Sequence, residues 1–138
     1  MNRLHRVDLL VLIAAVVAIT STTFAAQADD TPPKPRLETL LHAVLEGVDS
    51  TEVILSHIDI PPAAAFPRHY HPGEEFVYVL EGSGTAQLEG DEEMQFKAGD
   101  VVKIPFERVH WAKAGAEGFK AIVFRVHKTG MPERIMAE

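Results

Sequence analysis

The chain has 138 residues, with 13 Lys or Arg against 20 Asp or Glu, which gives a formal net charge of −7. This acidic balance argues against nucleic acid or an anionic membrane surface as a partner. The chain contains no cysteine, which excludes disulfides, thiolate metal ligands and cysteine nucleophiles together. Its length is typical of one domain.

The first 28 residues are predicted to be a secretory signal peptide. Arg3 and Arg6 form a basic start, residues 9–19 are an uncharged apolar run, and AQA at 26–28 is a small-residue cleavage site. An uncleaved membrane anchor is the alternative, but the apolar run is about half of the ~20 residues that a spanning helix needs. We therefore expect an exported protein, periplasmic or secreted, with no membrane partner after cleavage.

The segment that follows the signal is polar and rich in proline. Residues 29–36, DDTPPKPR, are predicted to be a flexible leader without a fold of its own. Residues 37–138 then form the one folded domain. RLETLLHAVL at 36–45 is the only helical candidate: its leucine spacing fits a short helix, but the segment fits an edge strand equally well.

Short apolar runs with a period of two residues recur through the rest of the chain, between turn signals. In TEVILSHIDI, at 51–60, Ile54, Ile58 and Ile60 share one face. FVYVL, at 76–80, is apolar on both faces and is predicted to be an interior strand. The remaining predicted strands are a hairpin made by 84–90 and 92–100, and the runs 101–105 and 119–127. Many short strands with almost no helix predict an antiparallel sandwich or barrel.

Histidines and a glutamate stand where two of these strands begin. His69 and His71 are two residues apart, so in an extended strand their side chains point to the same side. Glu74 and Glu75 follow, and the pattern alone does not say which of them points inward. His110 lies on another strand, in IPFERVHW. Three imidazoles and one carboxylate suit a borderline divalent metal with coordination positions left open, unlike a closed structural zinc site.

These two segments resemble the two sequence motifs of the cupin family. The first motif, G-x5-H-x-H-x3,4-E-x6-G, is matched at His69, His71, Glu75 and Gly82, with Ala63 in place of its leading glycine. The second, G-x5-P-x-G-x2-H-x3-N, is matched at Gly99, Pro105 and His110, with Glu107 in place of its second glycine and Ala114 in place of its asparagine. The resemblance extends over about residues 51–127.

The resemblance implies an all-β fold, a single antiparallel jelly-roll barrel with little helix. It also implies one divalent transition metal (Zn, Cu, Mn, Fe or Ni) held by His69, His71, Glu75 and His110, and it selects Glu75 over Glu74. Cupins are commonly homodimers, so a homodimer is expected. The loss of the motif glycine at Glu107 affects the turn before His110, whereas the lost asparagine at Ala114 touches no ligand.

The resemblance extends to quercetinase-like dioxygenases, which implies a dioxygenase-like oxidoreductase acting on a small enolic or aromatic molecule. Glu75 would then be a ligand and also a catalytic base. Two alternatives stay open. One is a redox-neutral metal-dependent isomerase or lyase, for which Tyr78 and Glu74 are the candidate acid–base residues. The other is a non-catalytic protein that binds a sugar-like small molecule.

The remaining histidines and the aromatic residues are predicted to have structural roles. His42, His57 and His127 have no partner in register and are predicted to lie on the surface. The aromatic residues Phe76, Tyr78 and Trp111 are predicted to pack in the core or at a dimer face. An exported chain takes its metal outside the cytoplasm, where the affinity order of divalent ions favours copper and zinc over iron and manganese. Because ligand type and metal availability also decide the outcome, our hypothesis is that the native ion is zinc, copper or manganese and not iron.

Overall fold

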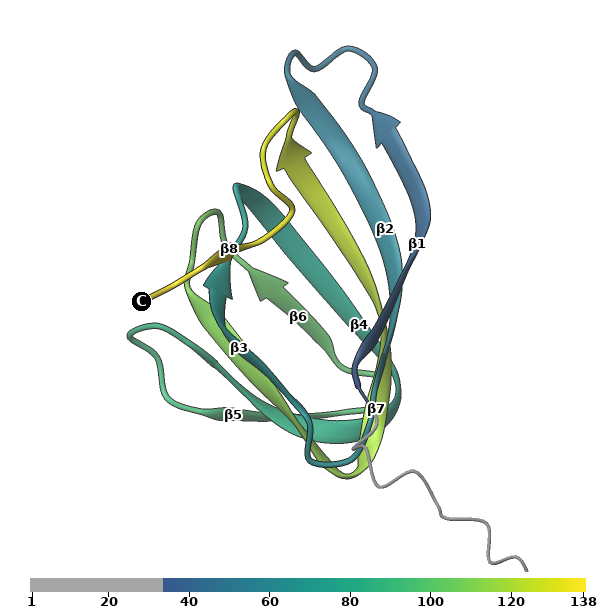
Figure 1. Cartoon of the computed structure of the whole chain (residues 1–138), viewed down its shortest axis with the longest axis vertical. Coiled ribbons are helices and arrows are strands. Elements are labelled where there is room, and N and C mark those ends of the chain that lie inside the picture. Colours follow the sequence, from purple (N-terminus) through teal and green to yellow (C-terminus); the bar gives the residue numbers. More distant parts are fainter. Residues whose placement is uncertain (1–33) are drawn as a thin grey trace, which may run out of the picture. The chain divides into compact units, whose positions relative to one another are not determined.

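The computed structural model describes residues 34–138, so the predicted signal peptide and most of the predicted leader lie outside the described residues. The described chain forms eight strands and no helix (Figure 1). They are β1 (Arg36–Val44), β2 (Thr51–Ile60), β3 (Ala65–Tyr70), β4 (Gly73–Leu88), β5 (Met94–Lys97), β6 (Val101–Ile104), β7 (His110–Lys128) and β8 (Ile135–Met136). A helix of the length and apolarity that a bilayer requires is absent from this described part.

Two long strands, β4 and β7, form the centre of the sheet. β7 pairs antiparallel with β2, β3 and β4, and β4 pairs antiparallel with β5, β6 and β7 (Figure 1). The pairing of β4 with β7 shifts register around Gly82, where an added Cβ would lie 2.1 Å from the Gly118 carbonyl oxygen. The predicted strands 76–80 and 84–90 are therefore two halves of one bent strand. The predicted all-β jelly-roll is confirmed.

The segment 36–44, for which helix and edge strand were both open, is the edge strand β1. It pairs with β2 in antiparallel register from Arg36 opposite Asp59 to Val44 opposite Glu52, with an irregularity between Thr39 and Leu41. All nine of its residues are exposed. A helix of this length would need to bury an apolar stripe to be stable, whereas a strand obtains its backbone hydrogen bonds from β2.

The barrel interior follows the period-two pattern of the strands. Ile54, Ile58 and Ile60 of β2 are buried, as the sequence predicts. In the second half of β7, Ala121, Val123, Arg125 and His127 are buried, while Ile122, Phe124 and Val126 alternate with them. The prediction that His127 lies on the surface is therefore wrong. Its exposure is only 1%, because it continues the inward face of β7 begun by Ala121.

The outward face of β4 is apolar and exposed. Tyr78 is 48% exposed and Leu80 40%, so Tyr78 does not pack in the core. The Phe76 ring lies 6.3 Å from the ring of Phe124 on the same outward surface. Residues 76–80 thus lie in the interior of the sheet, since β4 pairs with both β6 and β7. One face of this run is nevertheless open to solvent.

The two turns in which the cupin glycines are replaced keep a glycine-like backbone. Ala63 has φ 59° and Glu107 has φ 54°, a left-handed conformation that costs a side-chain-bearing residue about 1–2 kcal/mol. The amide of Glu107 donates to the His71 carbonyl at 3.2 Å. The turn before His110 therefore forms despite the lost glycine, and it ties the second motif to the first.

Candidate metal centre

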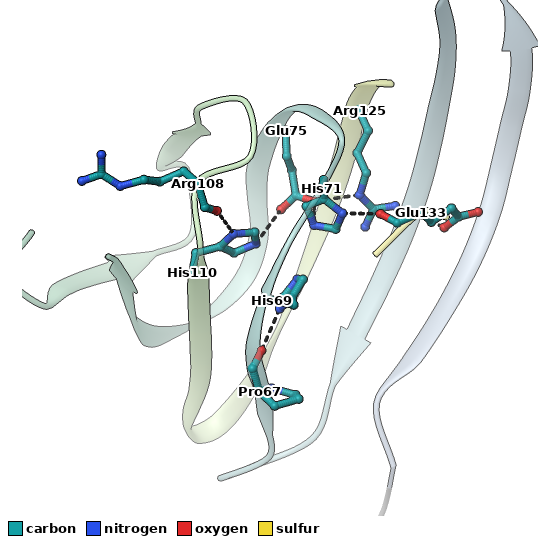
Figure 2. Close-up of polar contacts among 8 residues, drawn as sticks. All are labelled: Pro67, His69, His71, Glu75, Arg108, His110, Arg125 and Glu133. Carbon is teal, nitrogen blue, oxygen red and sulfur yellow. Dashed lines mark hydrogen bonds and ion pairs between the residues drawn. The ribbon is translucent and has the colours of Figure 1, made fainter. Parts of the chain in front are cut away.

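Three histidines meet inside the barrel. His69 on β3 and His110 on β7 are directly opposite in register, and His71 follows β3 immediately. Side chains opposite each other across an antiparallel pair are near neighbours, and these two rings lie 4.3 Å apart between centroids. One nitrogen from each of the three buried histidines lies within 4.8 Å of the others. We call these three residues the histidine cluster (Figure 2).

Each ring of the histidine cluster is oriented by a backbone carbonyl (Figure 2). Nδ1 of His69 donates to the Pro67 carbonyl at 2.7 Å, and Nδ1 of His110 donates to the Arg108 carbonyl at 2.9 Å. Nδ1 of His71 donates to the carbonyl of Glu133. A carbonyl can only accept, so the proton of each neutral ring sits on Nδ1 and Nε2 carries a free lone pair. Metal-binding histidines are oriented in the same way, by a hydrogen bond from the ring nitrogen that does not bind the metal.

The protonation state of the cluster also suits a metal. Burial lowers the pKa of His69 to about 4 and lowers the pKa of His110, so both rings are neutral near pH 7, the form that binds metal. Nε2 of His71 is buried and makes no hydrogen bond, although it lies 3.0 Å from Oε2 of Glu75. A divalent ion would give this nitrogen a partner, so the residues fit a borderline divalent metal.

Glu75 points inward from β4 and borders the cluster, while Glu74 points to solvent and pairs with Lys103 at 2.7 Å. Oε1 of Glu75 lies 3.9 Å from Nε2 of His110, but Glu75 does not belong to the set of ligand atoms within 4.8 Å of one another. Burial raises its pKa, but the charge of Arg125, whose Nε donates to Oε2, outweighs this and holds the pKa well below its ordinary value. Its role as fourth ligand stays a prediction.

Arg125 is a site residue that the sequence analysis missed. It is 5% exposed, and its Nε donates to Oε2 of Glu75 at 2.7 Å. Its Nη1 lies 3.6 Å from Oε2 of Glu133, an ion-pair distance too long for a hydrogen bond. The signal for Arg125 was present, because a charged residue alternated with Ala121 and Val123 on one face of β7. Glu133 had no such signal, since only the tertiary fold brings it here.

A cavity of about 570 Å³ opens onto the histidine cluster. Its wall away from the cluster is apolar and includes Phe66, Val77, Leu88, Phe96 and Phe119. Trp111 lines it as well, and its Nε1 is bound to Oε1 of Gln87 at 3.0 Å. Tyr78 and Glu74, the acid–base candidates from the sequence, are absent from the lining. The cavity thus suits a molecule with an apolar body and a metal-binding polar group.

A second buried polar group, the Glu52 cluster, consists of Glu52, His42 and His127. Glu52 and His127 are opposite each other on β2 and β7, with Oε1 of Glu52 3.4 Å from Nδ1 of His127. Oε2 of Glu52 lies 3.0 Å from Nε2 of His42, whose side chain is 53% exposed. Contact with His42 lowers the pKa of Glu52. Neither ring nitrogen of His127 makes a hydrogen bond.

The family of this protein is shown by its sequence. A cupin-domain family model matches residues 56–126, about half of the chain, and the chain belongs to the cupin family. An uncharacterized protein of Methanocaldococcus jannaschii is 33% identical over 64 residues, 46% of this chain and 55% of that protein. The match therefore spans about half the length of that relative.

Solved structures show the same fold. The DMSP lyase DddQ of Ruegeria pomeroyi superposes with a TM-score of 0.61 at 22% identity, covering 80% of this chain and 55% of that one. A cupin-like protein of Thermotoga maritima superposes with a TM-score of 0.58 at 27% identity, covering 75% of each chain. At such identities the likeness to the lyase concerns the fold alone.

Proposed function

We propose that this cupin is a metal-dependent, dioxygenase-like oxidoreductase acting on a small enolic or aromatic molecule. The observation that carries the proposal is the cavity. The apolar wall of the cavity leads to the three Nε2 atoms of the histidine cluster. A molecule with an apolar body and one oxygen-bearing end would therefore bind with its body against the wall and its oxygen at the metal end. A divalent ion bound to the cluster would supply Lewis-acid and redox chemistry at that end.

Each group of residues at the site would then have its own role. The histidine cluster holds the ion, and the apolar wall binds the body of the substrate and excludes water. Glu75 stays ionised beside Arg125, with its pKa at about 2. A carboxylate with so low a pKa accepts protons weakly at neutral pH. The ion pair therefore favours Glu75 as a ligand or as an orienting residue over the catalytic base that the family resemblance implies.

A redox-neutral isomerase or lyase is the second candidate. Tyr78 and Glu74 do not line the cavity, so they are unsuited to the acid–base role that such an enzyme requires. One observation still favours an isomerase or lyase. Glu133, whose side chain is 46% exposed, lines the cavity near the histidine cluster, and its carboxylate would be the acid–base group. A sugar-binding role is less well supported, because the wall offers few polar groups to hydroxyls.

The proposal includes export of the protein from the cytoplasm. A signal-bearing chain would collect its ion outside the cytoplasm, and zinc, copper or manganese is proposed over iron. Stoichiometric iron in protein purified from the exported fraction, measured by elemental analysis, would overturn that preference.

Oxygen consumption separates the two candidate reactions. Purified protein is loaded in turn with Mn²⁺, Cu²⁺ or Zn²⁺ and mixed with a panel of flavonols, catechols and β-diketones. The expected result is uptake of dioxygen with the redox-active ions and none with Zn²⁺, lost in the variant His69→Ala/His110→Ala. Substrate turnover with Zn²⁺ and without oxygen uptake would favour the lyase, and Glu133→Gln would then abolish it.

A further inference from the structure

The chain beyond β7 crosses the open end of the barrel instead of leaving it. After Lys128 the chain passes from β7 to β3, where β8 pairs antiparallel with His69 and Tyr70 (Figure 1, yellow). The amide of Ala137 donates to the Arg68 carbonyl at 3.1 Å, which extends this pairing. We call residues 130–138 the C-terminal strap. Glu133 and Arg134 of the strap line the cavity.

The strap supplies one of the three carbonyls that orient the histidine cluster. His69 and His110 are each held by a carbonyl two residues earlier on the same chain segment, at Pro67 and Arg108. His71 has no such local partner: its Nδ1 donates to the carbonyl of Glu133, 62 residues later (Figure 2). Two rings are therefore oriented by the chain segments that lead into them, and the third by a segment that must first dock.

The same residue reaches the other polar group of the site. The carboxylate of Glu133 lies 3.6 Å from Nη1 of Arg125, and Arg125 holds Glu75. A single residue of the strap thus contacts His71 through its backbone and Arg125 through its side chain. Both contacts depend on the pairing of β8 with β3, because that pairing fixes where Glu133 lies.

We propose that the C-terminal strap is part of the metal centre, with Glu133 as a positioning residue that sets the tautomer and direction of His71 through its backbone carbonyl. Undocking of the strap would free the His71 ring to turn and would allow its proton to move to Nε2, which a metal cannot then use. The inference rests on metal binding by the histidine cluster, as proposed above, and not on the reaction catalysed.

The test compares the Zn²⁺ affinity of the intact domain with that of two strap variants, by competition with a fluorescent chelator. One variant ends at Thr129. The other, Ile135→Pro/Ala137→Pro, keeps the full chain but removes two backbone N–H groups of the strap. The amide of Ala137 donates to β3. The register places the amide of Ile135 in the equivalent position, opposite Tyr70. Loss of the hydrogen-bond partner that orients a metal-binding histidine weakens metal binding about 10–100-fold, and we expect this loss in both variants.

Glu133→Ala is the matched control. It removes the contact with Arg125 but leaves the carbonyl that binds His71, so its Zn²⁺ affinity should stay within about threefold of that of the intact domain. A loss in Glu133→Ala as large as that in the strap variants would show that the side chain acts, and would overturn the role given to the carbonyl.

A spectroscopic readout separates positioning from general loss of structure. In the metal-free intact chain, NMR should show hydrogen-bonded Nδ1–H protons for all three histidines of the cluster, with that of His71 assigned through His71→Gln. The strap variants should lose the His71 signal and keep those of His69 and His110, which also shows that the barrel is folded. A rapidly exchanging His71 Nδ1–H in the intact chain would by itself overturn the proposal.

Unchanged Zn²⁺ affinity in a strap variant that has lost the His71 signal would also overturn it. Failure of the intact chain to bind Zn²⁺ would instead contradict the metal function proposed above. The two failures are therefore distinguishable.

Discussion

The histidine cluster and the Glu52 cluster contain the same kinds of residue but differ in how these are held. Both combine buried imidazole with a buried carboxylate on the inner faces of the strands. In the first, carbonyls fix three rings so that their nitrogens lie within 4.8 Å. In the second, Glu52 lies between His42 and His127, and within the described residues no second set of three ligand atoms meets the same limit. The two clusters therefore differ in whether three ligand atoms converge on one point, and not in the kinds of residue that they contain.

The largest expected effect is loss of the metal itself. His69→Ala/His110→Ala should reduce the metal content from about one ion per chain to nearly none, because too few ligands remain. His42→Ala/His127→Gln changes two histidines of the Glu52 cluster and should retain the ion. Elemental analysis of the purified proteins measures both. Full metal content in the first variant would show that the histidine cluster is not the site.

The two buried carboxylates should differ in their contribution to the stability of the metal-free chain. Glu75→Gln leaves the buried guanidinium of Arg125 with only the half-exposed carboxylate of Glu133, 3.6 Å from its Nη1, as a counter-charge, and breaking such a buried pair costs about 3–5 kcal/mol. Glu52→Gln should cost about 1 kcal/mol, because its histidine partners can lose their protons while arginine cannot. Urea unfolding in the presence of a chelator compares them. Equal losses would mean that Arg125 does not depend on Glu75.

The clusters should also respond to acid in different pH ranges. The folded pKa of His69 is lowered to about 4 from an ordinary 6.5, so the unfolded chain binds more protons between these values. Stability due to this group is complete above pH 6.5 and falls as the pH drops toward 4, by about 2 kcal/mol after a discount for the open cavity beside the ring.

The lowered pKa of Glu52 contributes stability above its ordinary value of 4.5, and this stability is lost only as the pH falls below 4.5. Urea unfolding from pH 7.5 to 3.5 should therefore show the His69 contribution first. His69→Gln should reduce the slope of the upper part of the profile, where the lowered pKa of His110 also contributes, and leave the lower part unchanged. A flat profile between pH 6.5 and 4.5 in the parent chain would contradict the lowered pKa of His69.

The smallest expected effect concerns the turns next to the two clusters. Glu107, before His110, has φ 54°, and Ser50, after β1, has φ 53°. Replacing either with glycine relieves a left-handed side-chain-bearing residue and should raise stability by about 0.5–1 kcal/mol, net of the entropy of glycine. Only Glu107→Gly lies beside a residue of the histidine cluster. A weakened Zn²⁺ affinity in that variant, and not in Ser50→Gly, would show that the turn also aims His110.

Much of the fold could be predicted because the strands alternate in polarity. The period-two runs of β2 and β7 separated their inward and outward faces, and turn residues marked most strand ends. The continuity of β4 through Gly82 was not visible, because glycines that usually mark a turn here allow a bend and a close backbone approach. His127 was misplaced because alternation gives two faces without saying which one is inward.

The site was predicted to the extent that it is local in sequence. The spacing of His69, His71 and His110 was sufficient to propose the metal centre, and the family motif distinguished Glu75 from Glu74. Arg125 and Glu133 were missed for different reasons. Arg125 is visible only once the inward face of β7 is known, and Glu133 acts through its backbone, which leaves no trace in residue type. The signal peptide at residues 1–28 and the homodimer stay predictions.

The pairing of His69 with His110 across β3 and β7 also ties occupancy of the site to folding. Their separation along the chain means that the ligands meet only after the barrel has closed, so an unfolded chain offers the ion no comparable site. By mass action, free metal at about 1,000 times its dissociation constant would then stabilise the closed barrel by about 4 kcal/mol. Metal supply would in that way set how much of the protein survives proteolysis.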